Sequence, residues 1–257
     1  MVIMKRTLED CSFGVKVGGE IYDNFGYADD LSLYTTTIKE MEEFLTKLIC
    51  NAADFGLQLN YTKTKFMLIG PLRQSNPSLK VNGETIERVN KFTYLGRILC
   101  EDGNDEPEVQ SRISNGWIAF NKKKNAITSR RLSMSTKRKT YETYILPVVM
   151  HGTEKIKWSP KLVTRMKTFE NHIMRWMCNA RLNDRISIQT LRSKTKIPCI
   201  TKAIKTRKLK YFGHMKRSTL PVKHVFEGMV QGKRRRGVPK RRWRKDVYEW
   251  TDEFIFI

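Results

Sequence analysis

The chain has 257 residues, of which 40% are apolar and 29% charged, and its formal net charge is +23. This length allows one large or two small domains with hydrophobic cores, and the apolar content excludes a largely disordered chain. No apolar run approaches the ~18 residues of a membrane helix, and the N-terminus lacks a signal-peptide pattern. The five widely spaced cysteines indicate free thiols, which predicts an intracellular protein with no membrane partner.

The positive charge lies in one half of the chain. Residues 1–107 carry 12 Lys and Arg against 16 Asp and Glu, whereas residues 108–257 carry the remaining 37 against the remaining 10. A basic half with a net charge of +27 predicts a polyanionic partner, most simply nucleic acid. The alternative is a solvated, lysine-rich surface.

The first elements in chain order are a helix end over residues 1–10, a strand over 12–17 and a hairpin over 27–34. Asp29 and Asp30 are expected in the turn of this hairpin. Two carboxylates in a turn must be solvated or hold a cation, and Mg²⁺ prefers such oxygen ligands. An ordinary acidic turn explains these residues about equally well, since Asp favours turns.

A helix over residues 37–55 is the next expected element. Thr37 and Glu40 have capping-box spacing, apolar residues recur at three- and four-residue steps, and Gly56 fits a C-terminal stop. Strands are expected at 57–60 and 65–69, with a turn carrying Lys63 between them. The dipeptide Asn82-Gly83 predicts a hairpin, and residues 92–96 read as a short strand ended by glycine.

This order of elements resembles the palm of reverse transcriptases from non-LTR (LINE-type, RTE-like) retrotransposons. Tyr27-Ala28-Asp29-Asp30 is similar to the metal-binding motif C of that family, residues 56–60 with Lys63 to its motif D, and residues 92–96 to its motif E. The resemblance implies that Asp29 and Asp30 coordinate a catalytic Mg²⁺ and that Lys63 is a proton donor to pyrophosphate. Lys65 is a second candidate donor, although a solvent-facing strand lysine explains it better. The resemblance further assigns the primer grip to Tyr94, Leu95 and Gly96.

The resemblance also implies motifs that the residues before Tyr27 do not supply. A two-metal site needs a third carboxylate from another strand, and no residue of 1–26 stands in the context of the family's motif A. Motif B, the fingers and the endonuclease of the family are likewise unmatched. The chain is therefore expected to be a C-terminal fragment that does not act as a nucleotidyltransferase by itself.

The basic half is expected to be helical. Helices are predicted over residues 106–128, from Ser135 or Thr136 to Leu146, from Ser159-Pro160 onward, over 187–194 and over 198–215. The first of these resemble the thumb that follows motif E, which lies along the template–primer duplex. Trp117, Trp158 and Trp176 could stack on bases, but core positions explain them better. Phosphate contacts are expected from Lys122, Lys123, Lys124, Arg130 and Arg131.

The C-terminal region contains a dense basic run over residues 233–245. This run predicts a flexible nucleic-acid arm or a nuclear-import signal, with a solvated tail as the alternative. The binding residues expected in it are Arg234, Arg235, Arg236, Lys240, Arg241 and Arg242. The spacing of Cys178, Cys199, His214 and His224 fits no zinc motif, so no zinc is expected. The sequence suggests no role for residues 246–257.

These observations predict an α+β chain with a partial palm over residues 1–100, thumb-like helices over 101–180 and a basic nucleic-acid-binding region over 181–257. The expected palm is an antiparallel sheet with a helix. The implied function is that of an RNA-directed DNA polymerase, with Mg²⁺ as cofactor and an RNA or DNA template–primer as partner. The alternative is a non-catalytic RNA- or DNA-binding protein that uses the thumb and the basic region. The oligomeric state is left open.

Overall fold

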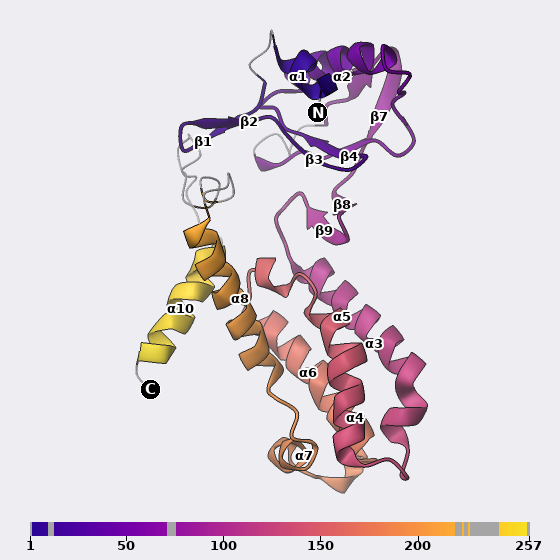
Figure 1. Ribbon diagram of the computed structural model, residues 1–257, viewed down its shortest axis with the longest axis vertical. Coiled ribbons are helices and arrows are strands. Elements are labelled where there is room, and N and C mark those ends of the chain that lie inside the picture. Colours follow the sequence, from indigo (N-terminus) through magenta and orange to yellow (C-terminus); the bar gives the residue numbers. More distant parts are fainter. Residues whose placement is uncertain are drawn as a thin grey trace. The chain divides into compact units, whose positions relative to one another are not determined.

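The computed structural model describes residues 2–9, 13–70, 76–218, 223, 226 and 242–255. It mixes helices and strands, as the predicted α+β class requires. Contacts divide the chain into two compact units, the first containing residues 1–94, 99–103 and 217–236 and the second residues 95–98, 104–216 and 237–257 (Figure 1). Within the described ranges, no helix has the length and apolar character needed to cross a membrane.

The first unit combines two packed helices with short strands. Helices α1 (Val2–Leu8) and α2 (Ile38–Ala53) are joined by a 3.0 Å hydrogen bond from Asn51 to Thr7. The strands are β1 (Val15–Val17), β2 (Glu20–Tyr22), β3 (Asn24–Tyr27), β4 (Asp30–Leu33), β5 (Lys65–Phe66), β6 (Leu79–Val81), β7 (Glu84–Arg88) and β8 (Lys91–Tyr94).

These strands correct the expectation of one antiparallel sheet. Among the described residues, β1 pairs with β2, β3 with β4, β6 with β7, and β8 with β9 (Arg97–Cys100), each as part of a separate small sheet. In addition, β5 runs parallel to β7. The sheets are local because most pairs are hairpins whose partners are adjacent in sequence, as at Asn82-Gly83, where both residues have positive φ (52° and 82°).

Both predicted ends of helix α2 are confirmed. The Thr37 side chain accepts a hydrogen bond from the Glu40 N–H, while the Glu40 carboxylate accepts one from the Thr36 N–H. At the other end, Leu57 N–H donates to Ala52 O and Gly56 N–H to Ala53 O, which is the Schellman pattern with Gly56 in the left-handed region.

The predicted strands at 57–60 and 65–69 are largely wrong. Residues 57–60 are not in a strand, and only Lys65–Phe66 of the second segment pairs with another strand. The turn predicted between them is present, since the Asn60 backbone oxygen accepts from the N–H groups of Lys63 and Thr64. Among the described residues of the two segments, only Lys65 and Phe66 have a partner strand, which is β7.

The second unit is helical and has the larger core. It contains α3 (Glu106–Thr128), α4 (Met134–Thr140), a π-helical turn η2 (Tyr141–Ile145), α5 (Leu146–Met150), α6 (Pro160–Met177), α7 (Ile188–Thr195), α8 (Ile200–Arg217) and α10 (Trp243–Ile255). Its shorter 3-10 turns are η3 (Thr153–Lys155) and η4 (Leu182–Asp184). The predicted bounds of α3 and the Ser159-Pro160 start of α6 are confirmed.

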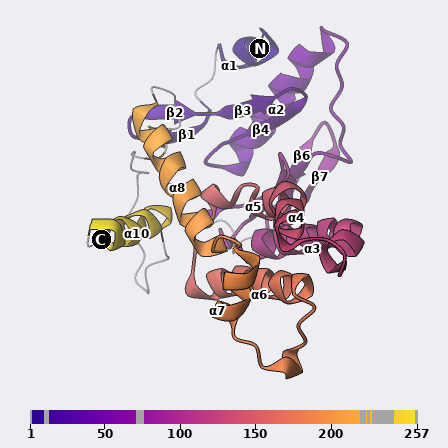
Figure 2. The ribbon, with the colours of Figure 1, turned by 60° about the horizontal axis from the view of Figure 1, so that its bottom comes forward.

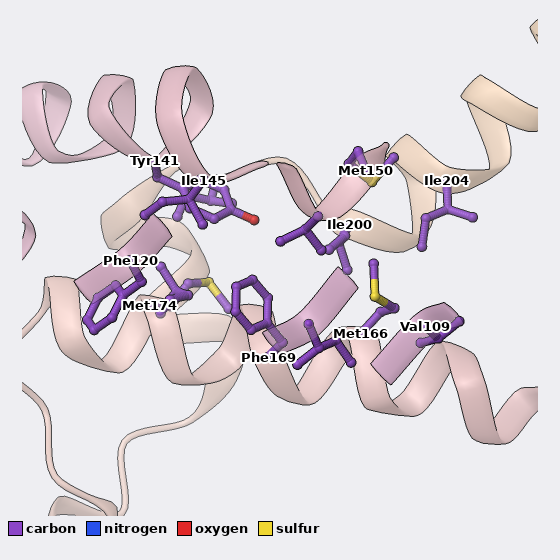
Figure 3. Close-up of a cluster of buried hydrophobic side chains, with 14 of the residues drawn as sticks. Val109, Phe120, Tyr141, Ile145, Met150, Met166, Phe169, Met174, Ile200 and Ile204 are labelled. Carbon is purple, nitrogen blue, oxygen red and sulfur yellow. The ribbon is translucent and has the colours of Figure 1, made fainter. Parts of the chain in front are cut away.

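One hydrophobic cluster joins the helices of this unit (Figure 3). Figure 1 shows α3, α5 and α6 side by side, and Figure 2 shows α7 against α6. Gly116 lets α3 approach closely, because a Cβ atom there would lie 2.4 Å from Val149 of α5. Leu191, Ile204 and Trp250 belong to the same cluster as Val109, so the predicted thumb and basic regions share one core.

The helix predicted from Ser135 or Thr136 to Leu146 differs at both ends. Ser133 is the N-cap, since its hydroxyl accepts from Thr136 N–H at 3.2 Å. The helical path continues through Pro147, because Leu146 N–H bonds to Tyr141 O, five residues back. Such a π-turn relieves the clash that proline would make in a regular helix.

A buried ion pair ties the last described helix to α8. Lys208 of α8 is fully buried and pairs with the buried carboxylate of Asp246. Lys208 Nζ also donates to Ile156 O at 2.6 Å, and Asp246 accepts from Trp158 N–H at 2.8 Å. Trp243–Ile255 therefore forms a helix of the second unit, so the described end of the predicted flexible arm is helical.

Replacing Asp246 by Asn should lower the free energy of unfolding by roughly 3–5 kcal/mol, because it leaves the ammonium of Lys208 buried without a counter-charge. The double variant Lys208→Met with Asp246→Leu should recover most of that loss, since it removes both charges. Chemical denaturation of the three proteins measures the effect. A double variant no more stable than Asp246→Asn would contradict the role given to this pair.

Candidate metal and nucleic-acid sites

Asp29 and Asp30 lie at the tip of the hairpin formed by β3 and β4. Tyr27 pairs with Asp30, so the loop has two residues, Ala28 and Asp29, and Asp30 begins β4 rather than lying in the turn. Ala28 takes the left-handed conformation (φ 54°) that this tight connection needs. Both carboxylates are exposed, so neither is part of a core.

The two carboxylates of the hairpin are ligands of the kind that Mg²⁺ prefers. One or two protein carboxylates with phosphate oxygens and water are the usual ligands of this ion, and Asp29 and Asp30 fit that number. Among the residues that the structure describes, no group of three or more His, Cys, Asp or Glu side chains could hold a metal. A two-metal site would therefore need a carboxylate from outside the described ranges.

Lys63 lies in a turn that Asn60 organises. The Asn60 side-chain oxygen accepts hydrogen bonds from Thr62 Oγ1 at 2.7 Å and from Lys63 N–H at 3.1 Å. The Lys63 side chain is exposed, whereas Lys65 is engaged with Glu87 of β7. This difference favours Lys63 as the available ammonium of the segment.

The acidic hairpin and the Lys63 turn pack on the same small core. Its buried residues are Leu45 of α2, Leu79 and Val81 of β6, and Ile86 of β7. Leu33 of β4 packs against this cluster from the hairpin side, and Leu59 and Tyr61 pack against it from either side of Asn60. The strand behind the two carboxylates and the turn carrying Lys63 are thus held by one set of contacts.

The segment assigned to the primer grip forms a tight hairpin turn. Tyr94 ends β8, Arg97 begins β9, and the two residues between them, Leu95 and Gly96, both have positive φ (47° and 73°). The Leu95 side chain is 49% exposed. A large side chain in the left-handed region is strained, which is typical of functional positions.

Two charged residues that the sequence interpretation missed hold this turn in place. Arg112 of α3 donates to Gly96 O, and its Nε donates to the Glu108 carboxylate at 2.6 Å. The other Glu108 oxygen accepts from Ile98 N–H at 2.8 Å, and Glu108 is only 1% exposed. The sequence held no specific signal for this buried pair, because a Glu and an Arg four residues apart are equally typical of an exposed helix face.

The predicted phosphate-binding residues of the second unit lie around the end of α3. Lys122, Lys124, Arg130 and Arg131 are exposed and Lys123 is half-buried. Residues 109–141 contain nine Lys and Arg and no Asp or Glu. Of the nine, Arg112 and Lys137 are buried and Arg138 pairs with Glu142, so most of the remaining positive charge lies around the end of α3. Arg242 is exposed just before α10, while Arg234, Arg235, Arg236, Lys240 and Arg241 lie outside the described residues.

The three tryptophans considered for stacking differ in burial. Trp158 is in the core and donates to Thr153 O, and half-buried Trp117 packs on Phe169, so the core interpretation holds for both. Trp176 is 43% exposed and does not belong to the apolar face of α6. Tyr144 is also exposed, because the π-turn places it away from its buried neighbours.

Replacing Leu95 by Gly should stabilise the protein by roughly 0.5–1 kcal/mol, because relief of the left-handed strain exceeds the added chain entropy. Leu99→Gly, in β9 and without positive φ, should instead destabilise it. Denaturant unfolding of both variants measures the difference. If Leu95→Gly were as destabilising as Leu99→Gly, the turn would not be strained.

No protein-family model matches the sequence. A Caenorhabditis elegans protein described as transposon-derived is 24% identical to the chain over 215 residues, which are 79% of this chain and 75% of that protein. This similarity supports a transposon origin for the chain.

Proposed function

We propose that the chain contributes the motif C, D and E segments and the thumb of a retrotransposon RNA-directed DNA polymerase. The observation that carries this proposal is the common core behind two exposed groups of opposite charge. The carboxylates of Asp29 and Asp30 extend from one segment of that core and the ammonium of Lys63 from another. The transposon-derived relative supports the transposon origin that this proposal requires.

Phosphoryl transfer needs groups that position and neutralise phosphates more than it needs covalent chemistry from the protein. A Mg²⁺ ion bound at the hairpin would neutralise negative charge on the phosphate oxygens. Asp29 and Asp30 would hold and orient that ion, and the Lys63 ammonium would neutralise or protonate the leaving pyrophosphate. The exposed turn at Leu95 and Gly96, fixed by Arg112, would support the end of the primer strand.

Catalysis in this proposal needs a third carboxylate in addition to Asp29 and Asp30, because two ions cannot be clamped by one acidic hairpin. The residues described by the structure do not place another acidic side chain beside that pair. The purified chain is therefore expected to bind metal and template–primer without extending the primer.

Metal binding can be tested without catalysis by replacing Mg²⁺ with Fe²⁺ and adding peroxide and ascorbate. Radicals formed at a bound iron cut nearby backbone, so fragments should end near Asp29, and excess Mg²⁺ should suppress them. Asp29→Asn with Asp30→Asn should abolish the cuts. Glu84→Gln is the matched control, since Glu84 pairs with Val81 as Asp30 pairs with Tyr27.

Cuts that persist in the Asp29→Asn, Asp30→Asn variant would show that the hairpin does not hold the metal. Primer extension by the purified chain with Mg²⁺ or Mn²⁺, lost in Asp29→Ala, would contradict the need for a further carboxylate.

A second candidate function is non-catalytic binding of RNA or DNA by the helical unit. It is favoured by the exposed residues Lys122, Lys124, Arg130 and Arg131, which lie in a stretch without Asp or Glu. Basic side chains on an exposed surface contact phosphates without reading base sequence, and such contacts release counterions from the nucleic acid. This function requires no metal and no additional carboxylate.

Binding to an RNA–DNA hybrid should weaken steeply with salt. Arg130→Gln with Arg131→Gln should reduce the slope of log K against log salt by about 2 if both contact phosphates. Lys161→Gln is the control, because Lys161 is exposed but paired with Glu106, and it should leave the slope unchanged. Fluorescence anisotropy at several salt concentrations measures this slope, and a flat salt dependence in the unmodified protein would contradict the function.

A further inference from the structure

Two exposed aromatic rings flank the basic end of α3, and a lysine covers each of them. Lys123 Nζ lies 4.4 Å from the centre of the Tyr144 ring, and Lys124 Nζ lies 5.0 Å from that of Trp176. Tyr144 is 52% exposed and Trp176 is 43% exposed. We call Lys123, Lys124, Tyr144 and Trp176 the lysine–aromatic face.

Both rings are exposed although their neighbours are buried. Tyr141 and Ile145, in the same π-turn as Tyr144, are fully buried, and the extra residue of that turn leaves Tyr144 outside the core. Trp176 contacts the buried ring of Phe120, with 5.9 Å between ring centres. Each ring is thus attached to rigid core structure on one side and accessible on the other.

The charge around the face points to an anionic ligand. Lys122, Arg130 and Arg131 are exposed nearby in sequence, and no Asp or Glu occurs between Val109 and Tyr141. Glu142, the first acidic residue after that stretch, pairs with Arg138 at 2.8 Å. Exposed aromatic rings among uncompensated lysines are the combination that single-stranded nucleic acids bind, through stacked bases and neutralised phosphates.

We propose that the lysine–aromatic face binds single-stranded RNA or DNA, with non-adjacent bases on Tyr144 and Trp176. Helix α3 contacts both η2 and α6, and its neighbouring residues Lys123 and Lys124 reach one ring each, so both rings border the same end of α3. A duplex does not suit this face, because its bases are stacked on each other and their flat surfaces are not available. This inference rests on the proposed nucleic-acid binding by the helical unit. It adds that the lysine–aromatic face of that unit binds the single-stranded form.

Binding exchanges one interaction of each lysine for another. In the free protein the ammonium groups of Lys123 and Lys124 occupy the ring faces through cation–π contacts. A base that stacks on the ring displaces the ammonium, which then contacts the adjacent phosphate. Both the ring and the lysine are therefore needed, and the stacking part of the affinity does not depend on salt.

The full chain should be titrated by anisotropy with a labelled single strand of roughly 16 nucleotides and with the corresponding RNA–DNA hybrid. Tyr144→Leu and Trp176→Leu should each lower the affinity for the single strand about tenfold, with an unchanged salt slope. Affinity for the hybrid should change less than about twofold. Tyr248→Leu is the control, because Tyr248 is 58% exposed on α10 and should have no effect.

A second measurement does not depend on the folding of variants. Photocrosslinking of a single strand containing 4-thiouridine to the unmodified protein should give adducts on Tyr144 or Trp176. The proposal would be overturned if the variants lost equal affinity for the single strand and for the hybrid. It would also be overturned if crosslinked adducts formed only on residues other than Tyr144 and Trp176. If the unmodified protein bound neither ligand, the proposed nucleic-acid binding itself would fail, whereas tight hybrid binding with unaffected variants would remove only this inference.

Discussion

The buried carboxylate of Glu108 determines how the start of the second unit is built. One of its oxygens accepts the backbone N–H of Ile98 and the other accepts the guanidinium of Arg112, which in turn reaches the carbonyl of Gly96. A carboxylate that is 1% exposed is unfavourable without such partners, and here all of them come from the hairpin and from its own helix. The strained turn at Leu95 persists because this set of bonds fixes the residues that follow it.

The same arrangement recurs at the other buried acids of the basic half. Glu170 accepts Ile200 N–H and Arg192, and Asp246 accepts Trp158 N–H and Lys208. Burial raises the pKa of the Glu170 carboxyl, although the hydrogen bond from Arg192 opposes the shift. Three of the ten acidic residues after position 107 are thus buried and hydrogen-bonded inside the protein. Fewer acidic groups are therefore left to offset the lysines and arginines at the surface, which is the physical basis of the proposed nucleic-acid binding.

Much of the helical architecture could be predicted from sequence, because caps and apolar spacing act locally. Thr37, Gly56, Ser159 and the bounds of α3 are examples. The extent of the strands after Gly56 could not be predicted, since it depends on a partner strand distant in sequence, and only Lys65 and Phe66 pair with β7. The burial of Lys208 depends on Asp246, 38 residues away, and lysines on a helix usually face solvent. At the candidate sites, the acidic hairpin and the Lys63 turn followed from local residue types. The exposure of Tyr144 did not, because the spacing of Tyr141, Tyr144 and Ile145 also fits the apolar face of a regular helix, and the π-turn was not predicted.

Native-state hydrogen exchange at Ile98 tests most directly whether buried carboxylates fix distant backbone in this protein. Glu108→Met keeps an apolar side chain of similar length and removes both acceptor oxygens. The account predicts that the Ile98 amide exchanges much faster in this variant than in the unmodified protein. The exchange rates of the Ile200 and Trp158 amides should change only as much as the overall stability of the variant changes. Equal protection of Ile98 in the variant and the unmodified protein would contradict the role assigned to Glu108.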